Sequence, residues 1–198
     1  LKAREVGRIC GVPFDGAAMV ETLWDLGILD PTAIWFVQRV GREIHLIDYY
    51  ENSGQPITHY FGVIAKKDYP YSKHRLPHDA EAREKGSGKS IADLFRSNGL
   101  PASIGRRLGP DVRINAAKSL FPRCWFDQTK CKEGIRMLSN YRQAINKTLD
   151  EFTADAVHDF ASHGADAFGE GAIANEQTKL ERRPMTPVRH SPGAWMGG

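Results

Sequence analysis

The chain is poor in cysteine, and its pattern of cysteines excludes two common classes of small protein. Only Cys10, Cys124 and Cys131 occur among 198 residues. An odd number at wide spacing argues against a disulfide framework and favours a reducing compartment. Cys124 and Cys131 are seven positions apart and have no matching Cys/His pair, which is poor spacing for zinc. We therefore expect both thiols to pack in the interior.

Long apolar runs are also lacking. No stretch approaches the ~18 apolar residues that span a bilayer, and no charged segment followed by an apolar one opens the chain as in a secretory leader. We expect neither a membrane partner nor secretion.

A complete phosphate-binding loop is missing as well. Gly86–Ser90 resembles the end of such a loop, but the pattern requires Gly seven positions before the final Ser, where Arg83 stands. The preceding Ala80–Lys85 is charged, whereas the loop needs a strand there. We expect no ATP binding in this domain.

Charge is unevenly distributed, although the net charge is only +3. Ile104–Lys147 contains ten Lys/Arg and three Asp/Glu, whereas Thr148–Glu170 contains six Asp/Glu and no Lys/Arg. A basic stretch beside an acidic one suits a protein that holds a polyanion and a divalent cation together. Solvated surface charge explains the same pattern equally well.

Three strands are predicted near the start of the chain. Met19–Asp25, Thr32–Val40 and Glu43–Tyr50 are rich in β-branched and aromatic residues or alternate in polarity. Asp30–Pro31 forms one turn and Gly41–Arg42 a two-residue hairpin loop. The three strands should be adjacent and antiparallel.

Helices and strands then alternate, which predicts an α/β fold with a mixed sheet flanked by helices. The predicted helices are Pro56–Lys67, Ser90–Ser97 (with Ser90 as N-cap), Asp111–Leu120, Cys131–Asn140 and Phe152–Phe168, and the predicted extended segments are His74–His78 and Pro101–Arg107. We divide the chain into an opening segment (residues 1–18), a domain (19–170) and a disordered, mildly basic tail (171–198).

Three aspartates are candidates for a shared site. Asp25 ends the first strand, Asp79 follows the extended segment His74–His78, and Asp166 lies on the last helix. Converging carboxylates repel one another unless cations lie among them, and hard oxygen ligands favour Mg²⁺ or Mn²⁺. Periodicity does not show that the three converge, and a single Asp is more often a cap or a surface residue.

Five segments, taken in order, resemble the C-terminal nuclease domain of the large terminase subunit of tailed bacteriophages. They are Trp24–Phe36 (WDLGILDPTAIWF), Glu43–Tyr50 (EIHLIDYY), Leu76–Ala80 (LPHDA), Pro122–Asp127 (PRCWFD) and His158–Phe168 (HDFASHGADAF). None is decisive alone, but together they extend over most of the chain.

The resemblance implies a ribonuclease H-like fold in which Asp25, Asp79 and Asp166 hold one or two Mg²⁺ or Mn²⁺ ions. It also implies a role for His163, three residues before the last aspartate and so on the same helical face. His163 would orient water or shuttle a proton; a packing or supporting role is the alternative.

The implied function is a metal-dependent endonuclease that cuts concatemeric phage DNA with low sequence specificity during genome packaging. Its partners would be double-stranded DNA, the portal and the small terminase subunit, and its location the host cytoplasm. The ATPase motor of that family is absent from this chain. Two alternatives remain, namely another ribonuclease H-like nuclease of the resolvase or integrase type, and a non-catalytic module that docks on DNA or the portal.

Other residues near these motifs have possible roles. Asp30 precedes Pro31 and is expected to be a turn residue rather than a ligand, and Asp159 a helix cap. Gly27 would allow close backbone approach beside Asp25. The candidate contacts to DNA phosphates, each equally explained as solvated charge, are Lys85, Lys89, Arg106 and Arg107.

Overall fold

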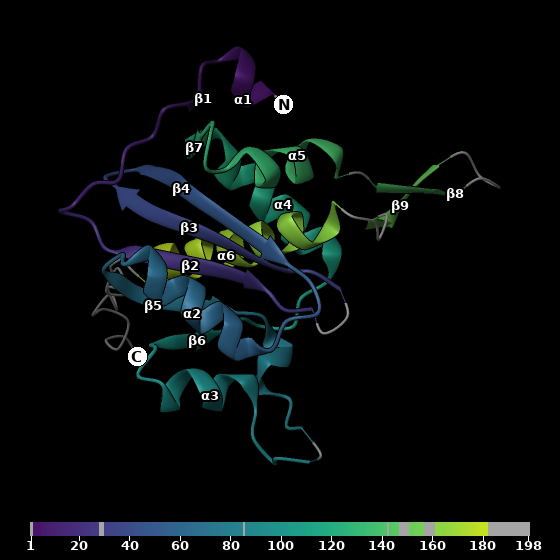
Figure 1. Ribbon diagram of the computed structural model, residues 1–198. Helices are drawn as coiled ribbons and strands as arrows, with labels where there is room; N and C mark the ends of the chain where they lie inside the picture. Colours follow the sequence, from purple (N-terminus) through teal and green to yellow (C-terminus); the bar gives the residue numbers. More distant parts are fainter. Residues whose placement is uncertain are drawn as a thin grey trace, which may run out of the picture.

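A seven-stranded mixed sheet forms the centre of the computed structural model, which describes residues 2–27, 30–84, 86–141, 143–146, 151–156 and 161–181 (Figure 1). The strand order is β1-β7-β4-β3-β2-β5-β6. Its strands are β1 (Ile9–Cys10), β2 (Val20–Asp25), β3 (Thr32–Val40), β4 (Glu43–Asn52), β5 (Tyr71–Leu76), β6 (Ala102–Ile104) and β7 (Cys124–Asp127). The predicted α/β fold with a mixed sheet is confirmed.

Helices flank this sheet, and a separate two-stranded sheet follows α5. The helices are α1 (Lys2–Glu5), α2 (Ile57–Lys67), α3 (Ile91–Ser97), α4 (Pro110–Leu120), α5 (Lys132–Asn140) and α6 (Ser162–Glu181), with short 3₁₀ turns η1 (His78–Glu81) and η2 (Phe121–Arg123). The small sheet pairs β8 (Gln143–Asn146) with β9 (Glu151–Ala156). No helix within the described ranges is long and apolar enough to cross a membrane.

The predicted antiparallel strands β2, β3 and β4 form the middle of the sheet. β3 pairs with both neighbours and is buried over most of its length, as its β-branched and aromatic composition favours. The β3–β4 turn contains Gly41 at φ 59°, a left-handed conformation that glycine adopts without strain. Strand pairing therefore confirms the first three predicted strands.

The remaining strands add to this centre in parallel. β5 pairs with β2 and β6 with β5, whereas β7 pairs with β4 and β1 with β7. Because β2 and β5 are parallel neighbours, Asp25 at the end of β2 and the residues after Leu76 at the end of β5 lie at the same edge of the sheet.

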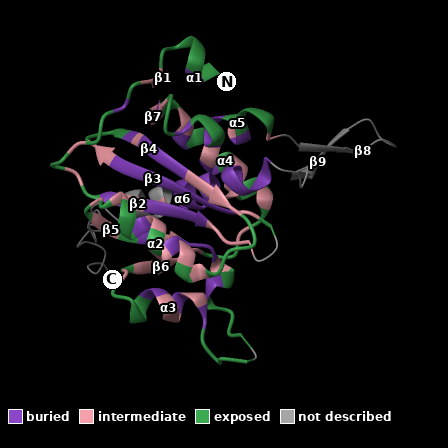
Figure 2. Cartoon of the chain, viewed as in Figure 1, coloured by how far each residue is buried: buried purple, intermediate pink, exposed green. Residues whose placement is uncertain are grey.

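The two faces of the sheet are covered by different helices. Residues of β2 and β3 such as Leu23 and Trp35 pack with α4, α5 and α6, and alternate residues such as Trp24 and Phe36 pack with α2 and α3. Successive residues of a strand point to opposite faces of the sheet, and here both faces are covered by helices. The central strands are accordingly buried while the outer surfaces of α2 and α3 are partly exposed (Figure 2).

Local features of the sequence predicted the positions of several helices correctly. Ser90 is the N-cap of α3: its hydroxyl accepts from the Asp93 amide at 3.1 Å, and the Asp93 carboxylate accepts from the Ser90 amide at 3.1 Å. This reciprocal pair satisfies two amide donors that the first helical turn leaves free. The predicted packing of Cys124 and Cys131 is also confirmed, since both free thiols are 0% exposed.

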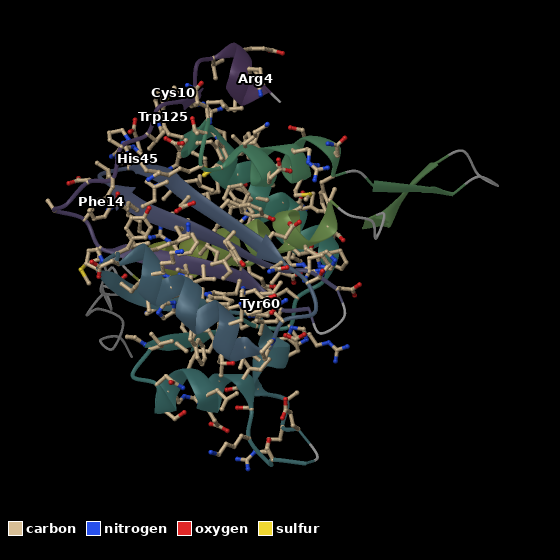
Figure 3. All side chains as sticks on the ribbon, viewed as in Figure 1. Arg4, Cys10, Phe14, His45, Tyr60 and Trp125 are labelled. Carbon is tan, nitrogen blue, oxygen red and sulfur yellow. The ribbon has the colours of Figure 1, made fainter. Side chains whose placement is uncertain are left out.

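Other expectations are corrected. The opening segment contributes strand β1, which extends the sheet beyond β7; Cys10, Trp125 and His45 mark these neighbouring strands in Figure 3. Residues 151–156 form strand β9, not the start of the last helix, which begins at Ser162.

The end of the last helix also differs from the expectation. Helix α6 continues to Glu181, past the predicted domain boundary at residue 171, and Ala172 and Ile173 are buried in the core. Residues 182–198 of the predicted tail lie outside the described part of the chain.

A buried polar network links β2 to β5. His74 is 0% exposed, and its Nδ1 lies 2.7 Å from the Thr22 hydroxyl, which also accepts from Trp24 Nε1 at 2.7 Å. His74 Nε2 is buried and has no hydrogen-bond partner. Burial lowers the pKa of His74 to about 4, because a charged imidazolium would lack water.

We predict that His74 makes the fold sensitive to mild acid. At a pH between the ordinary histidine pKa of 6.5 and about 4, His74 is protonated in the unfolded chain but neutral in the folded protein. The contribution to stability is therefore complete above about pH 6.5 and declines by up to about 1.4 kcal/mol per unit as the pH falls. Urea unfolding of the parent and His74→Gln at pH 6.5 and 5 measures it. The variant should lose less stability over this interval, and an equal loss in both proteins would contradict the assignment.

Candidate active site

Helix α6 approaches the sheet closely at its first turns. Trp35 Nε1 on β3 donates to the Gly164 carbonyl at 2.8 Å, which fixes the start of the helix over the sheet. A Cβ on Gly164 would lie 2.9 Å from both Met137 Cβ and Tyr49 Oη. Further along, a Cβ on Gly171 would lie 2.2 Å from Leu23 Cδ1. The glycines allow a separation that larger residues would prevent.

This approach brings His163 to the end of β2. His163 Nδ1 lies 2.9 Å from Asp25 Oδ2, although the residues are far apart in sequence. The hydrogen bond to Asp25 raises the pKa of His163, burial opposes this rise, and the charges of Asp25, Asp30 and Glu51 add to it. The structure thus joins two of the predicted site residues in one polar pair.

Further carboxylates lie around this pair. Asp25 and Glu51 both pair with Ala33 of β3, from opposite sides, and so flank it across the sheet. Tyr49 Oη donates to Glu51 Oε2 at 2.5 Å. These two carboxylates place negative charge at the end of the central sheet, which favours cations.

The turn after β2 is held in the predicted compact form. The Thr32 hydroxyl accepts from the Gly27 amide and donates to the Gly27 carbonyl, both at 3.1 Å. A Cβ at Gly27 would lie 2.2 Å from the Asp30 carbonyl oxygen, so only glycine fits. The expected close backbone approach at Gly27 is confirmed.

Asp166 follows His163 on α6 and faces helix α4. Its Oδ1 lies 3.8 Å from Arg113 Nη2, and Arg113 Nη1 lies 3.5 Å from Glu170 Oε1. Burial raises the pKa of Glu170, Arg113 opposes this rise, and the charges of Asp166 and Asp25 add to it. Glu170 and Arg113 were not predicted. The spacing of four from Asp166 places Glu170 on the same helical face and is the signal that could have identified it.

Asp79 is less closely integrated. It lies in η1, just beyond the end of β5, with an exposed side chain, and its carbonyl accepts from the Ala82 amide at 2.8 Å. The parallel pairing of β2 and β5 places it at the same edge of the sheet as Asp25. The strand expected to extend to His78 ends at Leu76.

The predicted basic residues lie on exposed loops. Arg106 and Arg107 are exposed between β6 and α4, and Lys89 is exposed before α3. The Lys89 amide donates to the Ser87 hydroxyl at 3.2 Å, and the Gly88 amide donates to the Glu84 carbonyl at 2.9 Å. These amides are thus engaged within their own turn instead of forming a phosphate cradle. Lys85 and Asp159 lie outside the described residues.

A mostly apolar cavity of about 430 Å³ opens beside Asp166. Its walls come from the opening segment, α4, α5 and α6 and include Arg113, Ile114, Tyr141 and Phe168. Burial raises the pKa of Tyr141 to about 12, and the charge of Asp166 adds to the rise while Arg113 opposes it. Arg113 thus lies at the boundary between an acidic site and an apolar space.

The ligand atoms available at this site are of the chemical type that a hard divalent cation binds. Asp25, Asp166 and Glu170 offer carboxylate oxygens, and Glu170 Oε2 is buried without a hydrogen-bond partner. The side chains of Asp25 and Asp166 each remain 23% exposed, which leaves them open to an ion. Among the described residues no three His, Cys, Asp or Glu are grouped closely enough to hold a metal ion. A metal site therefore requires these carboxylates to draw together.

Comparison with solved structures identifies the fold. The chain resembles the large terminase of a thermophilic bacteriophage (TM-score 0.65, 18% identity, 84% of this chain, 42% of the other). It also resembles the P22 large terminase nuclease domain (TM-score 0.64, 15% identity, 86% and 89%). A third similar structure is the nuclease domain of the bacteriophage SPP1 large terminase with bound Mn (TM-score 0.63, 15% identity, 84% and 94%).

These comparisons confirm the predicted ribonuclease H-like fold, as found in large terminase nuclease domains. The chain spans less than half the length of the thermophilic phage's large terminase and most of the length of the isolated nuclease domains. No protein-family model and no curated protein sequence matches it.

We predict that the fit of α6 is sensitive to a single methyl group. Gly171→Ala should lower the free energy of unfolding by about 1–3 kcal/mol, because the new Cβ overlaps Leu23. Gly62→Ala on α2 is the matched control, since nothing lies within 4 Å of its Cβ position. The control should gain up to about 1 kcal/mol from helix propensity. Equal stability of the two variants in urea would show that α6 is not packed this closely.

Proposed function

We propose that this domain is a metal-dependent DNA endonuclease that cuts concatemeric phage DNA during genome packaging. The observation that carries the proposal is the Asp25–His163 pair, 2.9 Å apart, at the end of a central strand in a fold shared with large terminase nuclease domains. The Mn bound to the SPP1 domain supports the use of a divalent ion.

Asp25, Asp79 and Asp166 are the proposed ligands of one or two Mg²⁺ or Mn²⁺ ions. When bound, such ions would activate water and neutralise the charge that develops on the leaving oxygen. For Asp79 to contribute, η1 must turn its exposed carboxylate toward Asp25. The strand register supports this, because β2 and β5 end together.

His163 has the contacts expected of a residue that holds a proton beside the reacting groups. Its Nδ1 is engaged by Asp25, and this hydrogen bond raises its pKa. Asp25 also fixes the orientation of the ring, as a carboxylate does for a general acid or base. We propose that His163 orients water or shuttles a proton.

Double-stranded DNA is the proposed substrate, bound through its phosphates and with little sequence readout. The exposed Arg106 and Arg107 follow β6, the neighbour of β5 at the edge where the acidic site lies. The portal, the small terminase subunit and a location in the host cytoplasm belong to the same proposal.

We predict that the three aspartates act as one unit. Asp25→Asn, Asp79→Asn and Asp166→Asn should each reduce cleavage of plasmid DNA by orders of magnitude in Mn²⁺, and EDTA should abolish cleavage by the parent. Double variants should be little worse than single ones, because groups that act together lose activity non-additively. Gel electrophoresis of nicked and linear products gives the rates.

Asp68→Asn is the matched control for loss of one carboxylate. Asp68 is exposed at the end of α2 with φ 52°, a conformation that Asn tolerates, so cleavage should be retained. Parental activity of Asp79→Asn alone would remove Asp79 from the site. Parental activity in all three variants would remove the three aspartates from the site, whereas no cleavage by the parent in Mn²⁺ would reject the nuclease and favour a non-catalytic docking module.

We also predict that Arg106 and Arg107 contact DNA phosphates. The double variant Arg106→Ala/Arg107→Ala should lower the slope of log affinity against log salt by about 2, since each phosphate contact contributes about 0.9. Fluorescence anisotropy with a duplex, in EDTA to prevent cleavage, measures this slope. The exposed pair Arg4→Ala/Arg42→Ala is the control; Arg4 lies on α1 (Figure 3). An unchanged slope in the first variant would place the DNA elsewhere.

A further inference from the structure

Arg113 lies between two carboxylates of the acidic site. It projects from α4 and reaches Asp166 Oδ1 at 3.8 Å and Glu170 Oε1 at 3.5 Å, both on α6. One guanidinium therefore neutralises two acids one helical turn apart.

These contacts are long for ion pairs between arginine and carboxylates. Charge-assisted hydrogen bonds between arginine and carboxylate are usually about 2.7–2.9 Å long, whereas those of Arg113 are 3.5 and 3.8 Å. Arg113 Nε and Glu170 Oε2 are both buried and have no hydrogen-bond partner. Arg113 thus balances the charge while its own Nε and Glu170 Oε2 stay without hydrogen bonds.

The backbone leaves room for the carboxylate of Glu170 beside Gly105. The Glu170 side chain is 5% exposed, and a Cβ on Gly105 would lie 2.5 Å from Glu170 Oε2. The same Cβ would lie 3.4 Å from the Leu76 carbonyl oxygen at the end of β5. The free carboxylate oxygen therefore lies against Gly105, beside the strand end that precedes Asp79.

We propose that Arg113 is a displaceable counter-cation, which holds Asp166 and Glu170 until a divalent ion competes for them. This inference rests on the metal dependence proposed above and adds Glu170 as a carboxylate that responds to the ion. Arg113 is a positioning residue, because it acts through the charges of Asp166 and Glu170.

Arg113 has space to move when it is displaced. Its side chain lines the cavity of about 430 Å³, together with Ile114, Ala117 and Tyr141. The apolar walls can cover the methylene groups of arginine while the guanidinium turns to solvent. We expect Arg113 to leave the carboxylates through a change of rotamer into this space.

Binding of Mn²⁺ to the full chain without DNA tests the proposal by calorimetry. Arg113→Gln should bind Mn²⁺ about tenfold more tightly than the parent, because the competing charge is removed. Arg113→Lys keeps the charge and should remain within about threefold of the parent. Arg42→Gln removes the same charge from the β3–β4 turn, at the opposite end of β3 from Ala33, and should change affinity less than about twofold.

Thermal unfolding in EDTA provides a second readout, which needs no metal. Arg113→Gln should unfold several degrees below the parent, because Asp166 and Glu170 then repel each other. Adding Glu170→Gln to that variant should restore much of the loss. If the Arg113→Gln variant folds and has the Mn²⁺ affinity of the parent, or the stability of the parent in EDTA, Arg113 is not a counter-cation. If neither parent nor variants bind Mn²⁺, the proposed metal dependence fails and the competition fails with it.

Discussion

The close approach of α6 to the sheet is the constraint on which the acidic site depends. The Trp35–Gly164 hydrogen bond fixes one end of the contact, and Gly171 against Leu23 fixes the next turns. At this distance His163 reaches the end of β2 and contacts Asp25. A helix displaced by a single methyl group would carry its polar residues away from Asp25, so packing and chemistry cannot be separated here.

The sequence allowed the centre of the fold to be predicted, because local chemistry decides it. β3 is recognisable from its β-branched and aromatic residues, and Ser90 with Asp93 marks the start of α3. The edge strand β1 could not be predicted, since two residues carry no periodicity and exist as a strand only by pairing with β7. Strand β9 was taken for helix for a related reason, because its partner β8 and not its own composition determines it.

The site was predictable in part for similar reasons. Asp25 and His163 were identified through motifs, and the structure places the two side chains in contact. Arg113 belongs to no motif, and its role arises only when α4 packs against α6. Glu170 stands four residues after Asp166, and the shared helical face is the only sign of it in the sequence. Charges that meet across separate elements are therefore the hardest part of such a site to infer.

The outer strands have a consequence for assembly. The sheet ends in β1, two residues long, on one side and in β6, three residues long, on the other. Long exposed edges recruit strands from other chains, whereas edges this short offer few backbone groups for such pairing. These two outermost strands therefore offer little backbone on which the sheet of another copy could build.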